Sequence, residues 1–243
     1  MTETNPWHTL TPHTALDAVE SIIEQSLTNL CLTRNSYINR VYEMETQDKE
    51  RIIVKFYRPQ RWTSDMIQEE HDFLHHCHQQ ELPVIPPLTF NQKTLFAFGN
   101  IPFAIFPKKG GRVIDELNQP LWEETGRLLG RLHTIGAKQN SSNRILWSPE
   151  TATQTHLETL LKHPACIPPD YEPILKQSIT SFIKKETPQF KNLETLLLHG
   201  DCHFGNIIYR PDESLYLVDF DDSARGPTIQ DLWMLLPDET PNC

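Results

Sequence analysis

Two short segments near the C-terminal end of the chain carry side chains suited to phosphoryl transfer. Asp201 and Asn206 lie in the stretch HGDCHFGN, and Asp219 follows the apolar run LYLV and opens the stretch DFDD. Phosphoryl transfer needs cations that neutralise the phosphates and a carboxylate that orients and deprotonates the attacking hydroxyl. At this spacing Asp201 faces the acceptor hydroxyl, whereas the Asn206 amide oxygen and the Asp219 carboxylate supply ligands for Mg²⁺. Asp, Gly and Asn are also common in turns, but both segments in this order predict a catalytic centre.

A lysine in the first half of the chain fits the same chemistry. Lys55 closes the apolar run IIVK, and a lysine inside an apolar strand needs an anion, because an unpaired buried ammonium is costly. Its predicted partner is Glu70 on the following helix; the alternative is Glu69, since adjacent helical residues point about 100° apart. We expect Lys55 to hold the ATP phosphates. The other interpretation is an edge-strand lysine with two solvated glutamates.

The segment RNSYINR, residues 34–40, lies where a phosphate-binding loop would cover ATP, yet it contains no glycine. Ser36 can offer its hydroxyl or amide group to a phosphate from a polar turn. An ordinary hairpin turn is the alternative interpretation.

The elements that position these residues predict an α+β fold with two lobes, like that of protein kinases. Residues 1–107 form a strand-rich ATP-binding lobe and residues 108–243 a mainly helical catalytic lobe, with a linker at 107–111. Thr14 and Asp17 predict the start of the first helix. The expected strands are 30–33, 41–45, 51–57, 94–98, 101–106, 206–209 and 215–220, and the later helices are 63–80, a leucine stripe at 121–132, 155–161, 173–184 and 229–236.

The composition bounds the partners and the compartment. Apolar residues make up 38% and charged residues 22% of the 243 residues, as in a soluble globular protein. The net charge of −10 argues against nucleic-acid and membrane-surface binding, because phosphates would repel the chain. No apolar run is long enough for a membrane helix. Five scattered cysteines without a C-x-x-C pair, and no signal peptide, favour a reduced cytoplasmic protein.

Three other features are interpreted as structural. His71 and His75 share a helix face, but without a carboxylate signature a solvated face is the preferred interpretation. His133 is expected to make a structural hydrogen bond. Cys202 adjoins Asp201, yet nothing in the sequence indicates a depressed thiol pKa.

The chain resembles the bacterial stress response kinase A family, Ser/Thr protein kinases within the aminoglycoside phosphotransferase and choline kinase superfamily. The matching stretches run from about residue 30 to 236: NSYINRVYE, IVKFYRPQRWT, the EEH helix, FAIFPKKGGR, GRLLGRLH, LHGDCHFGNI, LVDFDD and GPTIQDLWMLL.

The resemblance implies a role for each residue that matches a family motif. Asp201 would be the proton acceptor, Asn206 and Asp219 the Mg²⁺ ligands, and Ser36 an ATP contact. It also implies an adenine pocket at the Phe103–Pro107 hinge, with Phe103 and Phe106 as cofactor-binding residues, and Asp231 bracing the catalytic loop. The family is cytoplasmic, uses ATP and magnesium, and protects against envelope and oxidative stress.

Family members continue past QDLWMLL with helices that complete the second lobe, whereas this chain stops 24 residues after Asp219 (243 − 219). An incomplete lobe would expose apolar surface, so we expect a monomer that can associate through this lobe. The side chains concerned are Leu232, Trp233, Leu235 and Leu236.

The favoured hypothesis is an ATP- and Mg²⁺-dependent kinase that phosphorylates Ser or Thr hydroxyls of protein substrates. The alternatives are a small-molecule kinase acting on an aminoglycoside, choline or a similar alcohol, and an inactive ATP-binding module.

Overall fold

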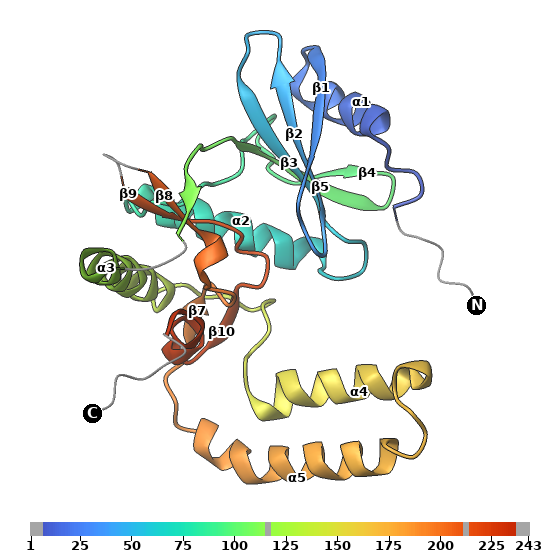
Figure 1. The fold of residues 1–243 in the computed structure, drawn as a ribbon, viewed down its shortest axis with the longest axis vertical. Helices are drawn as coiled ribbons and strands as arrows, with labels where there is room; N and C mark the ends of the chain where they lie inside the picture. Colours follow the sequence, from blue (N-terminus) through green and yellow to red (C-terminus); the bar gives the residue numbers. More distant parts are fainter. Residues whose placement is uncertain (1–6, 115–117, 211–213, 237–243) are drawn as a thin grey trace. The chain divides into compact units, whose positions relative to one another are not determined.

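The computed structural model describes residues 7–114, 118–210 and 214–236, and the chain divides into two compact units (Figure 1). Unit 1 comprises residues 1–116 and 207–221, and unit 2 comprises 117–206 and 222–243. The second unit therefore surrounds, in sequence, a short hairpin that belongs to the first. This division differs from a single cut after residue 107, because the hairpin pairs with the chain that follows the predicted linker.

Unit 1 is built on a five-stranded antiparallel sheet with the order β1-β2-β3-β5-β4. The polar turn 47–50 joins β2 to β3, and Lys49 takes a left-handed conformation there (φ 68°). The strands are β1 (Leu27–Arg34), β2 (Arg40–Thr46), β3 (Arg51–Phe56), β4 (Phe96–Phe98) and β5 (Ile101–Pro107).

The two faces of this sheet differ because side chains alternate along each strand. On β3, Ile52, Val54 and Phe56 are buried in a core that also includes Ala15 and Val19 of α1 (Pro12–Ile23). The other face of β3 carries Lys55. This alternation puts the lysine on the side of the sheet away from the apolar core.

Both helices of unit 1 begin at a threonine cap. The cap of α1 is Thr11, which forms a capping box with Thr14, so the helix starts earlier than the predicted Thr14–Asp17 signal. Helix α2 (Ser64–Gln79) starts after Thr63, whose hydroxyl accepts from the Met66 amide, and confirms the predicted helix at 63–80.

A small three-stranded sheet completes unit 1. Strands β8 (Ile207–Arg210) and β9 (Ser214–Leu217) form the predicted hairpin, and β6 (Arg112–Val113) pairs with β8. β9 ends at Leu217, before the predicted end at residue 220. The three residues after Val218 are thereby released from the ladder.

Unit 2 is mainly helical and contains a two-stranded sheet. Helix α3 (Gln119–Gly136) carries the predicted leucine stripe, and the predicted helix at 173–184 is longer in the structure. The predicted helix at 229–236 is wrong, since two short 3₁₀ turns stand there. The remaining elements are a π-helical turn η1 (Pro149–Thr153), α4 (Gln154–Lys162), η2 (Pro164–Cys166), α5 (Glu172–Phe190), β7 (Leu196–Leu198), η3 (Phe204–Asn206), β10 (Ala224–Gly226), η4 (Thr228–Asp231) and η5 (Trp233–Leu235).

Some apolar side chains at the end of unit 2 are exposed, as expected for three of the four residues named above. Leu235 is buried, whereas Leu232, Trp233 and Leu236 are exposed. Across the part of the chain that the structure describes, no helix is both long and apolar enough to cross a membrane.

Candidate active site

In unit 1, the Lys55 ammonium lies between two carboxylates of the segment that follows β9. Its Nζ donates to Asp219 Oδ1 at 2.8 Å and also to Asp221 Oδ1. Burial disfavours the charged ammonium, but the two aspartates outweigh it and raise the pKa of Lys55 well above its ordinary value. Lys55 therefore stays protonated and holds the two carboxylates beside the sheet.

Asp219 has the backbone and exposure of a ligand-binding residue. Its φ is 65°, in the left-handed region that few residues other than glycine enter. Phe220, on its C-terminal side, is buried and contacts the Phe73 ring of α2 at 5.9 Å between centroids. Because Phe220 is anchored inside, the Asp219 side chain is turned outward, and 51% of it stays accessible beside Lys55.

Asp221 joins Lys55 to the turn that was predicted to cover phosphates. Asn39 donates from Nδ2 to Asp221 Oδ2, and its Oδ1 accepts from the Arg58 amide at 3.0 Å. In the same turn Ser36 Oγ accepts from the Asn39 amide at 3.2 Å. Burial raises the pKa of Asp221, and the charge of Lys55 opposes the shift. The glycine-free turn is thus fixed by side-chain hydrogen bonds.

Glu70 faces the interior of unit 1, as predicted, and is 1% exposed, whereas Glu69 is half-buried. Its negative charge helps to raise the pKa of Lys55. The ion pairs given above for the ammonium, however, go to Asp219 and Asp221 and not to Glu70. The sequence missed these partners because they lie about 165 residues away (|i−j| 164 and 166).

In unit 2, Asp201 and Asn206 belong to one compact loop. Asn206 Nδ2 donates to the Asp201 main-chain oxygen at 2.9 Å and lies 3.4 Å from Asp201 Oδ2. His203 Nε2 lies 3.6 Å from the same carboxylate oxygen. The Asp201 side chain is 42% exposed. The loop thus presents an accessible carboxylate whose neighbours limit its orientation.

The loop that carries Asp201 is held in place by Asp231, which is fully buried. Its carboxylate accepts from the amides of His199 and Gly200 at 3.0 and 2.8 Å, and from His133 Nε2 at 3.0 Å. The bracing by Asp231 and the structural hydrogen bond of His133 are present as expected. Gly200 has φ 87°, and a Cβ there would lie 2.0 Å from the Asp222 main-chain oxygen, so only glycine fits.

Phe103, a candidate for the adenine pocket, lies in the core of unit 1. It stacks on Phe56 with ring centroids 5.0 Å apart and is 1% exposed. The register pairs Lys55 with Ala104, so Ala104 and Phe106 share the lysine's face while Phe103 points the other way. The Phe106 ring lies 5.8 Å from Lys55 Nζ. Because side chains alternate between the two faces of a strand, the spacing of Phe103 and Phe106 in the sequence could have predicted that they lie on opposite faces of β5.

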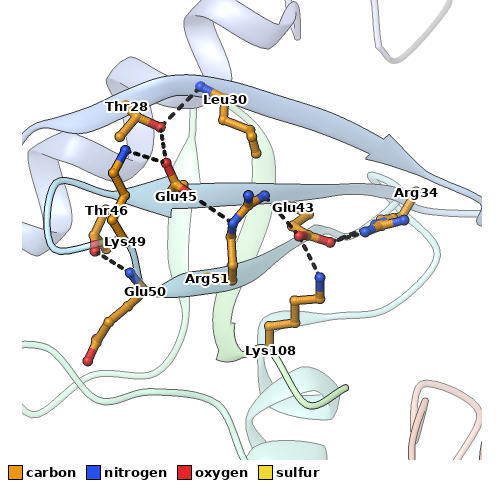
Figure 2. A network of polar contacts seen from close by, with 10 residues as sticks. All are labelled: Thr28, Leu30, Arg34, Glu43, Glu45, Thr46, Lys49, Glu50, Arg51 and Lys108. Carbon is orange, nitrogen blue, oxygen red and sulfur yellow. Dashed lines mark hydrogen bonds and ion pairs between the residues drawn. The ribbon is translucent and has the colours of Figure 1, made fainter. Parts of the chain in front are cut away.

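A second polar cluster lies on the same sheet around Glu43, which is 1% exposed, and was not predicted (Figure 2). Its carboxylate accepts from Arg34 Nε at 2.9 Å, Arg51 at 3.1 Å and Lys108 at 2.6 Å. Burial disfavours ionisation, but the hydrogen bonds from Lys108 and Arg34 outweigh it and lower the pKa of Glu43. The cluster ties β1 and β2 to the start of β3 and the end of β5.

Of the features interpreted as structural, Cys202 agrees with its interpretation and His71 does not. Burial raises the pKa of the Cys202 thiol, which keeps it protonated and unreactive. His71 is fully buried and hydrogen-bonded, so its interpretation as part of a solvated face is wrong. Cys77, on the same helix, is also buried.

The donor atoms of the two units suit Mg²⁺. Asp219 offers a half-exposed carboxylate and Asn206 an amide oxygen, and Mg²⁺ prefers a few hard oxygen ligands while it keeps several waters. Within the described residues, no group of three or more His, Cys, Asp and Glu side chains could hold a metal ion.

Comparison with known proteins also points to phosphotransferases and kinases. The model of the phosphotransferase enzyme family (APH) matches residues 32–242. The serine/threonine protein kinase RdoA of Salmonella typhimurium is 40% identical over 237 residues, covering 95% of this chain and 69% of that protein. Stress response kinase A of Escherichia coli K12 is 39% identical with the same coverage.

Solved structures share the fold at lower identity. Amicoumacin kinase hAmiN, in complex with AMP-PNP, Ca²⁺ and Ami, has a TM-score of 0.74 and 22% identity, over 92% of this chain and 67% of that chain. A microcompartment-associated aminopropanol kinase has a TM-score of 0.59 and 17% identity, over 90% and 72%. These similarities establish a two-lobed, kinase-like α+β fold.

Proposed function

Since the chain belongs to the phosphotransferase enzyme family, we propose that it is an ATP- and Mg²⁺-dependent kinase acting on Ser or Thr hydroxyls of proteins in a cytoplasmic stress response. The observation that carries the proposal is the protonated Lys55 beside an exposed Asp219 that has a left-handed backbone. The relatives of about 40% identity are named as a Ser/Thr protein kinase and a stress response kinase, which favours a protein acceptor.

Unit 1 would bind the nucleotide. Ala104 and Phe106 offer the apolar face for adenine. The Lys55 ammonium donates hydrogen bonds to the phosphates and gives up some of its hydrogen bonds to the two aspartates. The turn that contains Ser36 covers the phosphates and is kept in shape by Asn39. These residues bind and orient ATP and take no part in proton transfer.

Unit 2 would supply the acceptor side of the reaction. Asp201 orients the acceptor hydroxyl and takes its proton as the oxygen attacks the γ-phosphorus; the bond from the γ-phosphorus to the bridging oxygen breaks and ADP leaves. Asn206 and Asp219 would hold Mg²⁺, which neutralises charge on the phosphates when bound. Asn206 also limits the orientation of Asp201, and Asp231 keeps the loop backbone in place. The proposal requires the two half-sites to act on one ATP molecule.

The test of the proposed chemistry is the Asp201→Ala variant. Loss of a positioned general base lowers turnover about 10²–10⁴-fold, whereas binding of Mg–ATP should stay close to that of the wild type. Initial rates with radiolabelled ATP and titration calorimetry measure the two effects separately. Asp170→Ala, which removes an exposed carboxylate elsewhere in unit 2, is the matched control. Near-normal turnover of Asp201→Ala would contradict its assigned role.

A small-molecule acceptor is the second candidate, because the structural neighbours are named as kinases of small molecules. Radiolabelled ATP offered in parallel to generic protein substrates and to aminoglycosides and amino alcohols separates the two. We expect label in protein. Label confined to the small alcohols would replace the protein acceptor while retaining the phosphotransfer chemistry.

A further inference from the structure

A chain of buried hydrogen bonds runs through unit 1 behind Lys55. His71 Nδ1 lies 2.8 Å from Thr94 Oγ1, and His71 Nε2 lies 3.1 Å from the Tyr57 hydroxyl. The Tyr57 hydroxyl donates to Glu70 Oε1 at 3.4 Å. His71 and Tyr57 are fully buried, Glu70 is 1% exposed and Thr94 is 8% exposed. Four polar side chains are thus joined inside the unit.

The donors in this chain point in one direction. The Glu70 carboxylate only accepts, so the single hydroxyl proton of Tyr57 is used on Glu70. The Tyr57 oxygen must then accept from His71, which places a proton on His71 Nε2. At the other ring nitrogen, His71 Nδ1 lies within hydrogen-bond distance of the Thr94 hydroxyl, whose oxygen accepts from Gln68 Nε2 at 3.4 Å. Each group therefore fixes the next one towards Glu70.

The inner end of the chain acts on the ammonium proposed to hold ATP. The Tyr57 ring lies 5.6 Å from Lys55 Nζ, and the negative charge of Glu70 helps to raise the pKa of Lys55. The outer end, with Thr94 and Gln68, lines a groove of about 1060 Å³ between α2 and the β4 region. The chain thus connects this groove to the neighbourhood of Lys55.

We propose that His71 is a positioning residue for nucleotide binding: through Tyr57 it holds Glu70 and the aromatic ring in place beside Lys55. His71 touches no reacting atom. The inference rests on the proposed function, because it assigns His71 a role in the ATP site of unit 1. A residue that only fills the core would need shape and apolar character at this position, not a donor at Nε2.

Conservative variants separate these two roles. Gln places an amide nitrogen near the position of His Nε2 and can donate to Tyr57, whereas Leu fills the space without a donor. Positioning predicts that His71→Gln binds Mg–AMP-PNP more tightly than His71→Leu. Core filling predicts the opposite order, because Leu buries no unsatisfied polar group.

Tyr57→Phe removes only the hydroxyl that joins His71 to Glu70. We expect it to weaken binding of Mg–AMP-PNP about three- to tenfold, as for the loss of one hydrogen bond, and to add little in a His71→Leu background. Tyr42→Phe is the matched control: Tyr42 is a buried tyrosine of the same sheet and lies in the apolar core on the other face. It should leave the affinity unchanged.

The measurement is titration calorimetry of the full chain with Mg–AMP-PNP, after circular dichroism shows that each variant is folded. Weaker binding by Tyr57→Phe than by Tyr42→Phe, with Gln better than Leu at residue 71, supports the proposal. If the wild type binds Mg–AMP-PNP and Tyr57→Phe binds it equally well, this inference alone is wrong. Absence of wild-type binding overturns the proposed function and this inference with it. If His71→Leu does not fold, the two tyrosine variants decide.

Discussion

At the scale of single residues, Asp219 combines a left-handed backbone with an exposed carboxylate beside a buried ammonium. Asparagine also enters the left-handed region readily, so Asp219→Asn keeps the backbone and removes the charge. We expect the Mg²⁺ concentration for half-maximal turnover to rise at least about tenfold, as when a metal site loses support. Magnesium titrations at fixed ATP measure this.

Asp48→Asn, in the exposed turn after β2, is the matched control for Asp219→Asn. An unchanged magnesium requirement in Asp219→Asn would remove this residue from the metal site.

Glu43 makes a prediction about stability and pH. Its folded pKa lies below the ordinary value of 4.5, so its contribution is present above that pH and is lost as the pH falls through the folded pKa. Glu43→Gln should lower the free energy of unfolding by about 1–2 kcal/mol at pH 7, and the difference from the wild type should shrink below about pH 4.5. Denaturant unfolding at several pH values measures it.

Glu50→Gln, at an exposed position nearby, should show neither effect. A difference for Glu43→Gln that is the same at pH 7 and pH 3.5 would mean that the charge is not what stabilises the cluster.

Residues that belong to a short sequence motif could be proposed as site residues from the sequence alone. Lys55 ends an apolar strand, and Asp201 and Asn206 share one loop. The contact between Asp221 and Asn39 was not predicted, because the two residues are 182 positions apart and only the fold brings them together. The burial of His71 was not predicted, because its face of α2 looks polar in the sequence. In the structure, Tyr57 and Thr94 lie within hydrogen-bond distance of its two ring nitrogens.

At the scale of elements, the loop before Asp201 depends on Gly200. A methyl group there would meet the Asp222 main chain, and φ 87° is itself unfavourable for alanine. Gly200→Ala should lower the free energy of unfolding by about 1–3 kcal/mol. Turnover should also fall, because the loop that carries Asp201 must shift to make room for the methyl group. Thermal unfolding and initial rates measure the two effects.

Gly126→Ala is the control in the same unit, since nothing lies within 4 Å of the added methyl group in α3. It should stabilise the chain by about 0.5–1 kcal/mol, because alanine is the better helix former. Equal effects of the two substitutions would show that the loop geometry at Gly200 is not required.

Most strands and helices were predicted, but the two shortest strands of unit 2 were not. Helix α2 and strand β3 match the predicted ranges 63–80 and 51–57 closely. Strands β7 and β10 have three residues each, too few to show a period. The predicted helix at 229–236 failed because residues 228–235 form two 3₁₀ turns, the first of which ends at Asp231, whose side chain holds the catalytic loop.

At the scale of the whole molecule, two units interleave in sequence. The β8–β9 hairpin belongs to unit 1, although it follows the catalytic loop of unit 2. Lys55 and Asp219 therefore come from one unit and Asp201 and Asn206 from the other. Composition and motif order predicted two lobes, but the membership of the hairpin depends on pairing between β6 and β8 that no local pattern reveals.

The most direct measurement is a crystal structure of the full chain with AMP-PNP and Mg²⁺. We expect a metal ion that touches an Asp219 carboxylate oxygen, the Asn206 amide oxygen and phosphate oxygens, with Lys55 Nζ on a phosphate and Asp201 open to an acceptor. A nucleotide bound elsewhere, or a metal ion that contacts neither Asp219 nor Asn206, would contradict it.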